Sequence, residues 1–367
     1  MSDSKQTLKL APPLTLAWSW GMSDGRAPLL GAGLVIVRSR KQACEALDEK
    51  TGHTVWSFKP PGRGSTALGE AVLGDSVLVA LGQRERMGQI RLKDGSLKRE
   101  LPWRHQVRLK VAGETIFAED ATGFWAGRVE REKPIWRHQV SREPHGWAAG
   151  EFAVGQGRLV YGLKEGPVVC VDARTGREVW RSSIADLTSR GLSAIDRPGE
   201  VSGPIFVHED VVIVASFPRH IVGLSLASGK RLWTFVGDNG MAQLYGGRFY
   251  VSAGWLSCRT GRLTKRGKLQ WPEELQRKGV YTRGGWLISD THLFVGTTHG
   301  YIVALERGSG TCAWYTRPDG AIGQIQSEGI VGSNGTLYYV DQSKRLFCFQ
   351  EAKHESVRGA GRSGVRT

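Results

Sequence analysis

The sequence lacks the features that most quickly assign a protein to a compartment or a membrane. Its 367 residues contain no continuous apolar run long enough for a secretory leader or a membrane-spanning helix. The cysteines are few and show no Cys-x-x-Cys spacing, so neither a zinc site nor a full disulfide framework is indicated. These absences predict a soluble, cytoplasmic protein with reduced thiols and no membrane span.

Signatures of common catalytic sites are also missing. The nine histidines form no His-Glu-x-x-His or His-x-His pattern, and no glycine-rich stretch carries the Gly-Lys-Ser/Thr of a phosphate-binding loop. The pair Gly31 and Gly33 precedes an expected strand instead of opening a helix. The sequence therefore predicts no catalytic residues, no metal and no cofactor.

The charge is strongly unbalanced. Fifty basic against 35 acidic residues give a formal net charge of +15, which attracts polyanions such as nucleic acid or anionic lipid. The basic residues are scattered, so solubility is an equally good explanation. They gather only in the tail at residues 351–367, which we expect to be disordered.

Glycine and tryptophan are abundant, with 49 and 13 residues, and they recur together as Gly-x-x-x-Trp. The five complete copies are Gly52 to Trp56, Gly176 to Trp180, Gly229 to Trp233, Gly267 to Trp271 and Gly310 to Trp314. Two further copies keep only the tryptophan, at Trp18 and Trp136, and one keeps the turn Asp94-Gly95 with Arg99 in place of tryptophan. These eight positions are 37 to 53 residues apart, a spacing typical of four-stranded propeller blades.

Each part of the repeat has a structural reading. The glycine follows a small polar or basic residue, as expected for a hairpin turn that needs a positive φ. The tryptophan on the next strand would pack between adjacent blades, where its indole N–H can reach a backbone carbonyl. A small residue precedes each turn, which explains two of the cysteines as buried hydrophobes. The small residues are Ala46, Cys170, Gly223, Ala304 and Cys348.

The two ends of the chain complement each other. Residues Leu14 to Trp20 form a tryptophan strand with no blade before it, whereas Gly329 to Phe349 supply three strands with no tryptophan strand after them. Pairing the two would close the ring and remove its open sheet edges. The predicted fold is an all-β, eight-bladed propeller of four-stranded blades, forming a single domain over residues 1–350.

Units such as VVCVDARTGREVW, CEALDEKTGHTVW and YIVALERGSGTCAW resemble the repeat of the quinoprotein (PQQ-like) propellers over nearly the whole chain. The resemblance implies the fold but covers relatives with different functions. They include exported alcohol dehydrogenases that bind pyrroloquinoline quinone, an outer-membrane assembly lipoprotein, and sensor or scaffold domains. The dehydrogenases carry adjacent cysteines against the quinone, and this sequence has none. Asp48 and Asp172, the clearest family carboxylates, are better explained as turn caps, so a non-enzymatic cytoplasmic member is predicted.

Candidate partner contacts lie on the connections between blades, because rigid scaffolds often carry function on such loops. A near-duplicate, Trp-Arg-His-Gln-Val, occurs at residues 103–107 and 136–140, and the longest connection spans residues 181–203. The duplication indicates either a shared patch for an anionic partner or preserved blade geometry. The candidate contact residues are Arg104, His105, Arg108, Arg137, His138, Arg142, Arg190 and Arg197.

Three functions remain open at this point. The first is a protein-binding scaffold, either a monomer or one component of a hetero-complex. The second is a propeller that binds nucleic acid or another polyanion, which would need basic residues and exposed aromatics on one face. A quinone-dependent dehydrogenase is a distant third.

Overall fold

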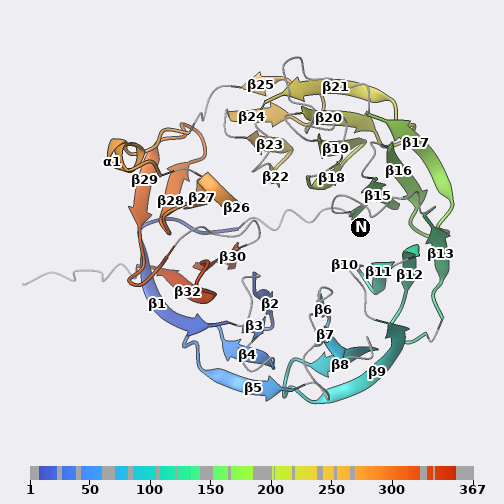
Figure 1. Cartoon of the computed structure of the whole chain (residues 1–367), viewed down its shortest axis with the longest axis horizontal. Helices are drawn as coiled ribbons and strands as arrows, with labels where there is room; N and C mark the ends of the chain where they lie inside the picture. Colours follow the sequence, from blue (N-terminus) through green and yellow to red (C-terminus); the bar gives the residue numbers. More distant parts are fainter. Residues whose placement is uncertain are drawn as a thin grey trace, which may run out of the picture.

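The eight blades surround a central axis and form a closed ring (Figure 1). The computed structural model describes residues 8–22, 27–38, 43–59, 71–81, 86–104, 108–120, 122–131, 133–140, 152–163, 167–184, 201, 203–216, 220–237, 243–251, 254–264, 269–280, 282–322, 329–333 and 335–352. Each blade is an antiparallel sheet of four strands that follow one another from the axis outward. The predicted all-β, eight-bladed propeller is thereby confirmed.

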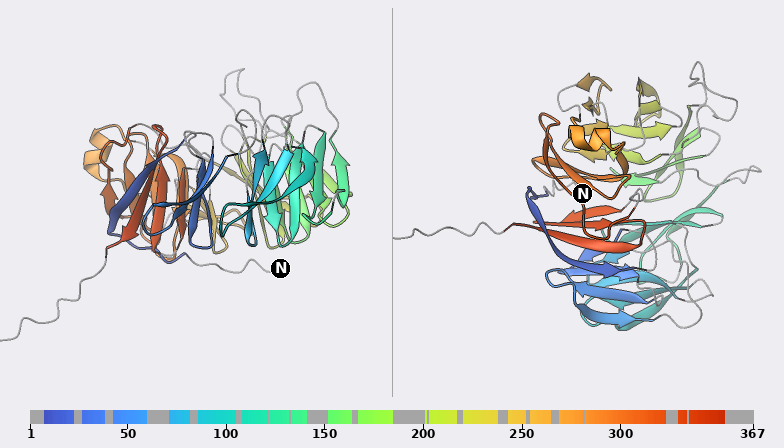
Figure 2. Two further views of the ribbon diagram at one scale, coloured as in Figure 1. Left: turned by 90° about the horizontal axis from the view of Figure 1, so that it is seen from below. Right: turned by 60° about the vertical axis from the view of Figure 1, so that its left-hand side comes forward.

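The strands alternate direction along the ring axis, as the side views show (Figure 2). Blade 1 consists of β2 (Leu29–Gly31), β3 (Leu34–Arg38), β4 (Cys44–Asp48) and β5 (Thr54–Phe58), and blade 2 of β6 (Ala71–Leu73), β7 (Ser76–Leu81), β8 (Arg86–Arg91) and β9 (Leu97–Arg104). Blade 3 consists of β10 (Arg108–Ala112), β11 (Thr115–Asp120), β12 (Gly123–Gly127) and β13 (Trp136–Gln139), and blade 4 of β14 (Ala153–Gly155), β15 (Arg158–Gly162), β16 (Pro167–Asp172) and β17 (Glu178–Ser183).

Blades 5 to 8 continue the same order. Blade 5 consists of β18 (Ile205–His208), β19 (Val211–Ser216), β20 (His220–Ser225) and β21 (Arg231–Val236), and blade 6 of β22 (Gln243–Tyr245), β23 (Arg248–Val251), β24 (Gly254–Ser257) and β25 (Leu263–Thr264). Blade 7 consists of β26 (Thr282–Ile288), β27 (His292–Thr297), β28 (Ile302–Glu306) and β29 (Cys312–Thr316). Blade 8 consists of β30 (Ile330–Ser333), β31 (Thr336–Val340) and β32 (Arg345–Glu351) with β1 (Leu14–Gly21).

The ring closes where the two ends of the chain meet. β1 pairs antiparallel with β32, from Leu14 opposite Glu351 to Gly21 opposite Arg345. Figure 2 shows the blue β1 beside the red strands of the last blade. The predicted closure by the N-terminal strand is confirmed, and the described chain ends at Ala352, so the predicted tail lies almost wholly outside the described residues.

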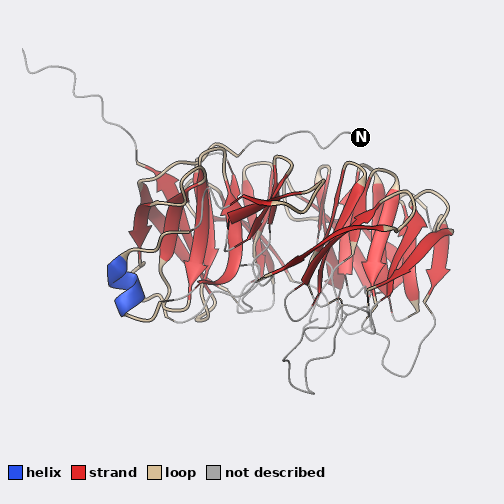
Figure 3. Ribbon diagram, turned by 90° about the horizontal axis from the view of Figure 1, so that it is seen from above, coloured by secondary structure: helices blue, strands red, loops and turns tan. Residues whose placement is uncertain are grey.

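The first and third turns of each blade lie on the same face of the ring. We use "first turn" for the link between the first and second strands of a blade and "third turn" for the link between its third and fourth strands. The short helix α1 (Glu273–Arg277) lies instead in the connection from β25 to β26, and Figure 3 shows it at one end of the ring.

The core is divided among the junctions between blades. Eight clusters of buried apolar side chains lie one at each junction, and each draws on the strands of two neighbouring blades. Val160 and Val168 of blade 4, for example, pack with Val212 and Val222 of blade 5. Because no single blade can bury its apolar faces alone, its stability depends on its neighbours.

Five of the repeated tryptophans join their blade to the next. In these five, the indole Nε1 donates a hydrogen bond to a backbone carbonyl in the third turn of the following blade, and the ring covers the turn glycine there. The donor–acceptor distances are 3.3 Å from Trp18 to Glu49, 2.7 Å from Trp56 to Leu92, 2.9 Å from Trp136 to Ala173, 2.8 Å from Trp180 to Leu226 and 3.0 Å from Trp233 to Cys258. The described turn glycines have positive φ, with 70° at Gly52, 72° at Gly176, 70° at Gly229 and 76° at Gly310.

Blades 2 and 6 depart from this pattern. In blade 2, Arg99 occupies the tryptophan position and donates from Nε to the buried Gln89, 3.1 Å away, so a polar pair replaces the small residue and the tryptophan. In blade 6, Trp271 lies beyond β25 instead of on the fourth strand, which corrects its expected place. The glycine beneath Trp233 is Gly261, with φ 65°, whereas Gly267 lies outside the described residues.

Blade 6 carries a further tryptophan on its third strand. Trp255 of β24 stands where most blades carry a small residue, and it packs with the cluster between blades 6 and 7. Trp271 packs against the same cluster from its place beyond β25, so two tryptophans contribute to this junction.

Candidate functional site

Three of the predicted partner-contact residues have described side chains, and all three lie in blade 3. Arg108 begins β10, and Arg137 and His138 lie on β13. Arg104 ends β9, but its side chain is outside the described part of the structure. His105, Arg142, Arg190 and Arg197 also fall outside the described residues, so their contact role stays a prediction.

Arg108 is held by a buried carboxylate. It stands opposite Glu119 in the β10–β11 pairing, and its Nη1 lies 3.4 Å from Glu119 Oε2. Only 6% of the Glu119 side chain is exposed, against 36% for Arg108. Burial raises the pKa of Glu119, and the Arg108 charge opposes this shift only in part.

The raised pKa of Glu119 predicts that this residue lowers the stability of the folded protein as pH rises. The folded protein binds this proton more tightly than the unfolded chain, so the stabilisation is present below the ordinary pKa of 4.5 and is lost as pH rises through the raised value. Relative to the wild type, Glu119→Gln should gain stability as pH rises from about 4 to 7. Each tenfold increase in proton affinity on folding corresponds to about 1.4 kcal/mol of this gain. Urea unfolding across this range measures the difference.

The matched control for this prediction is Glu114→Gln. Glu114 lies on the preceding turn, is 79% exposed and has Arg128 3.6 Å away. Its substitution should leave the pH profile parallel to that of the wild type, because exposed ion pairs contribute little. A parallel profile for Glu119→Gln as well would contradict the predicted cost.

Arg137 takes part in a surface pair on the same blade. Its Nη1 lies 2.8 Å from Asp120 Oδ2, while Thr122 donates to the other carboxylate oxygen from its backbone N–H and its hydroxyl. Burial opposes ionisation of Asp120, but the hydrogen bonds from Thr122 and Arg137 prevail and lower its pKa. Arg137 remains 54% exposed, which makes it the most accessible of the three described residues that were predicted to contact a partner.

His138 belongs to the junction between blades 3 and 4. Its Nε2 lies 2.9 Å from the Tyr161 hydroxyl, and its Nδ1 lies 3.1 Å from the Gly176 carbonyl oxygen. Tyr161 also stacks near Phe124, with ring centroids 4.4 Å apart. Two contacts to blade 4 make His138 a joint between blades, and its partner contact stays a prediction.

The duplicated Trp-Arg-His-Gln-Val segments do not occupy equivalent positions. Trp136 lies in the tryptophan position of blade 3, opposite Ala126. Blade 2 has Arg99 in that position, opposite Gln89, and Trp103 follows four residues later on the same strand. The two similar segments therefore occupy different structural positions in blades 2 and 3.

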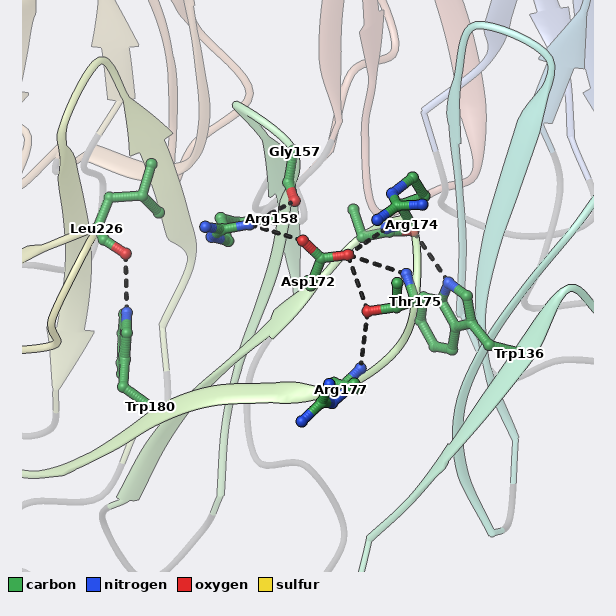
Figure 4. A network of polar contacts seen from close by, with 10 residues as sticks. Trp136, Gly157, Arg158, Asp172, Arg174, Thr175, Arg177, Trp180 and Leu226 are labelled. Atoms are coloured by element: carbon green, nitrogen blue, oxygen red, sulfur yellow. Dashed lines mark hydrogen bonds and ion pairs between the residues drawn. The ribbon is translucent and has the colours of Figure 1, made fainter.

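The third turn of blade 4 shows how the repeat holds its charges (Figure 4). Asp172 Oδ1 accepts hydrogen bonds from the Thr175 hydroxyl and from the backbone N–H groups of Arg174 and Thr175. Its other oxygen lies 2.9 Å from Nη1 of Arg158, which stands opposite it in the sheet. The hydrogen bonds from Thr175 outweigh desolvation and lower the pKa of Asp172. The ionised Asp172 carboxylate therefore pairs with the Arg158 guanidinium within the same blade.

Burial opposes ionisation of three cysteine thiols. None of the five cysteines is in a disulfide, and burial raises the pKa of Cys170, Cys258 and Cys348 to about 12 in each case. Among the described residues, no group of three or more histidine, cysteine, aspartate or glutamate side chains is placed to hold a metal ion. No helix within the described ranges is both long enough and apolar enough to cross a membrane.

Comparison with known proteins adds the family. The family model described as outer membrane protein assembly factor BamB matches residues 15–124 and 126–359. The chain belongs to the BamB family. BamB of Burkholderia pseudomallei is 22% identical over 383 residues, covering 95% of this chain and 93% of that protein. BamB of Pseudomonas aeruginosa is 27% identical over 162 residues, and this match spans 43% of the chain and only 40% of that relative.

Solved structures agree on the architecture. BamB from Moraxella catarrhalis superposes with a TM-score of 0.63 at 15% identity, covering 92% of this chain and all of that one (100%). The quinohemoprotein alcohol dehydrogenase from Comamonas testosteroni gives a TM-score of 0.60 at 12% identity, with 92% and 76% of the two chains covered. At these identities both likenesses show the fold alone.

Membership of the BamB family corrects the predicted location. The sequence predicted a cytoplasmic protein, but the family and its curated relatives are named outer membrane protein assembly factors. The expectation relied on a missing leader-like segment and on unpaired cysteines. Neither property is part of the propeller repeat on which the family match rests.

Proposed function

We propose that this chain is a non-enzymatic, protein-binding component of an outer membrane protein assembly system. The observation that carries the proposal is membership of the BamB family across almost the whole propeller, with a full-length relative matched over 93% of its length. The reported BamB relatives are named as assembly factors, and none of them is named as an enzyme.

The geometry supports a scaffold. Tryptophan joints link one blade to the next at five junctions, and β1 removes the sheet edge at the ring closure. A rigid surface binds a partner without a large cost of ordering itself. The alternative of nucleic-acid binding is not favoured, because the reported BamB relatives are not named for it.

The test is recovery of partners from the native host. The full chain with an affinity tag should retain defined proteins in fixed stoichiometry, and tagging those proteins should recover this chain in return. Depleting the chain should lower the amounts of outer membrane proteins. Purification of the chain alone after crosslinking, together with unchanged outer membrane proteins, would refute the proposal.

A further inference from the structure

The third turn of blade 6 repeats the blade 4 turn without its acids. We use "blade-6 arginine turn" for residues 257–263 together with Arg248, which begins β23. Residues 172–178 of blade 4 read Asp-Ala-Arg-Thr-Gly-Arg-Glu, and residues 257–263 read Ser-Cys-Arg-Thr-Gly-Arg-Leu. Serine and leucine thus stand in place of the aspartate and glutamate, while both arginines are kept.

The two turns have the same backbone. Gly261 N–H donates to the Ser257 carbonyl at 2.8 Å, as Gly176 does to Asp172 at 2.8 Å. Ser257 N–H donates in turn to the Arg262 carbonyl at 3.1 Å, matching the bond from Asp172 to Arg177 at 2.9 Å. The loss of the acids therefore leaves the conformation of the turn intact.

The arginine opposite the turn is also retained. Arg158 of blade 4 stands opposite Asp172 and pairs with it at 2.9 Å, whereas Arg248 of blade 6 stands opposite Ser257. The Arg248 guanidinium lies over the Trp255 ring, 4.4 Å from its centroid, and the side chain is exposed. Stacking on tryptophan holds the charge in place without neutralising it.

No acidic group of the described chain forms an ion pair with the arginines of this turn. Arg248, Arg259 and Arg262 form no ion pair with any residue that the structure describes. Between Asp238 and Glu273 the sequence contains no acidic residue and six basic ones. Of the acids on the neighbouring first turns, Asp290 accepts a hydrogen bond from the Tyr245 hydroxyl. Glu209 of blade 5 lies 3.9 Å from His208 and close enough to Cys258 to help raise the pKa of that thiol, but it forms no ion pair with the three arginines.

We propose that the blade-6 arginine turn binds carboxylate groups of an acidic segment of a partner protein. Blade 4 shows which group satisfies an arginine at this place in the repeat, because the carboxylate of Asp172 does so there. In blade 6 the partner would supply the carboxylate that Ser257 lacks, and arginine offers forked donors that match it. This inference rests on the proposed function in that the ligand is a protein.

The test is a binding titration with a short synthetic peptide of alternating aspartate and glutamate. Arg248→Gln should weaken binding about tenfold at low salt, because this arginine has no carboxylate opposite it. The matched control is Arg158→Gln, which removes the same charge from the equivalent position of blade 4, where Asp172 already pairs with the guanidinium. This control should change the affinity by less than about threefold, since general attraction depends on net charge alone.

A second variant removes no arginine. Ser257→Asp restores the blade 4 arrangement, so the new carboxylate should pair with Arg248 and lower peptide affinity by a similar factor. Ser225→Asp is its control, because Ser225 holds the same position in blade 5 but stands opposite Val211. The control should leave the affinity within about twofold, because its added charge has no opposing arginine to neutralise.

The outcomes separate three readings. Equal losses for Arg248→Gln and Arg158→Gln would show general attraction to a basic protein and would overturn the proposal. A single-stranded oligonucleotide that depends on blade 6 while the peptide does not would assign the turn to phosphate, which also overturns it. If native partners bind normally to variants that have lost the peptide, this inference fails while the proposed function stands.

Discussion

Trp180→Ala should destabilise the protein by about 3 to 5 kcal/mol, the range for truncating a large buried aromatic residue. The Trp180 side chain is 8% exposed, and it packs in the cluster between blades 4 and 5. Its Nε1 also donates to the Leu226 carbonyl, 2.8 Å away, so the substitution leaves a cavity and an unpaired acceptor. Chemical unfolding followed by tryptophan fluorescence and circular dichroism measures the loss.

The control for this prediction is the neighbouring residue. Val179 is 40% exposed, and Val179→Ala should cost well under about 1 kcal/mol. Similar losses at Val179 and Trp180 would mean that the tryptophan does not act as the joint between the blades.

The other half of the joint can be tested from the glycine. A Cβ added at Gly229 would lie 2.6 Å from the Trp180 ring, and the φ of 70° adds strain for any side chain. Gly74 has a φ of 57° with nothing within 4 Å of such a Cβ, so Gly74→Ala measures the strain alone. The excess loss of Gly229→Ala over Gly74→Ala therefore reports the contact with the ring.

Repetition explains why the fold could be predicted. Short apolar runs and turn glycines recur at one spacing, so each unit predicts four short strands, and β18 to β21 follow this order in blade 5. The closing strand could be found because Leu14 to Trp20 had a tryptophan but no preceding blade. Each of these inferences compares one repeat unit with several others, so an atypical residue in one unit does not change the prediction.

Blade 6 shows where the same reasoning failed. Its true turn glycine, Gly261, is followed four residues later by Lys265, whereas Gly267 and Trp271 match the expected pattern. The sequence pattern therefore points to the wrong turn, because Trp271 lies beyond β25 and packs at the junction together with Trp255 of the third strand. A rule based on one strand cannot detect a side chain supplied by another.

The candidate site was less predictable because partners across a sheet depend on register. The sequence does not show that Arg108 faces Glu119 or that His138 reaches Tyr161 in the next blade. The blade-6 arginine turn did have a signal in the sequence. Comparing residues 257–263 with 172–178 position by position reveals the missing acids, but their meaning depends on knowing that Arg158 and Arg248 stand opposite them.

Deleting residues 1–22 should open the ring and cause aggregation. The deletion removes β1, which pairs with β32 from Leu14 to Gly21, and it exposes the edge of β32 along this length. It also removes Leu14 and Met22, which are 4% and 1% exposed. An uncovered strand edge beside uncovered apolar surface is a template for pairing with a second chain. Light scattering coupled to size-exclusion chromatography should show oligomers, and melting should lose its cooperativity.

A circular permutant separates loss of the strand from loss of the N-terminus. In this variant the chain starts at residue 27, and residues 8–22 follow residue 352 through a short Gly-Ser linker. The linker has little distance to span, because the backbones of Lys9 and Glu351 both hydrogen-bond to Gly335. The permutant regains every β1 contact with a new order of strands, so it should be monomeric and melt as the wild type does. A soluble, cooperatively melting deletion would contradict the closure mechanism, and an aggregated permutant would mean that the connection from β1 to β2, rather than the pairing of β1, holds the ring together.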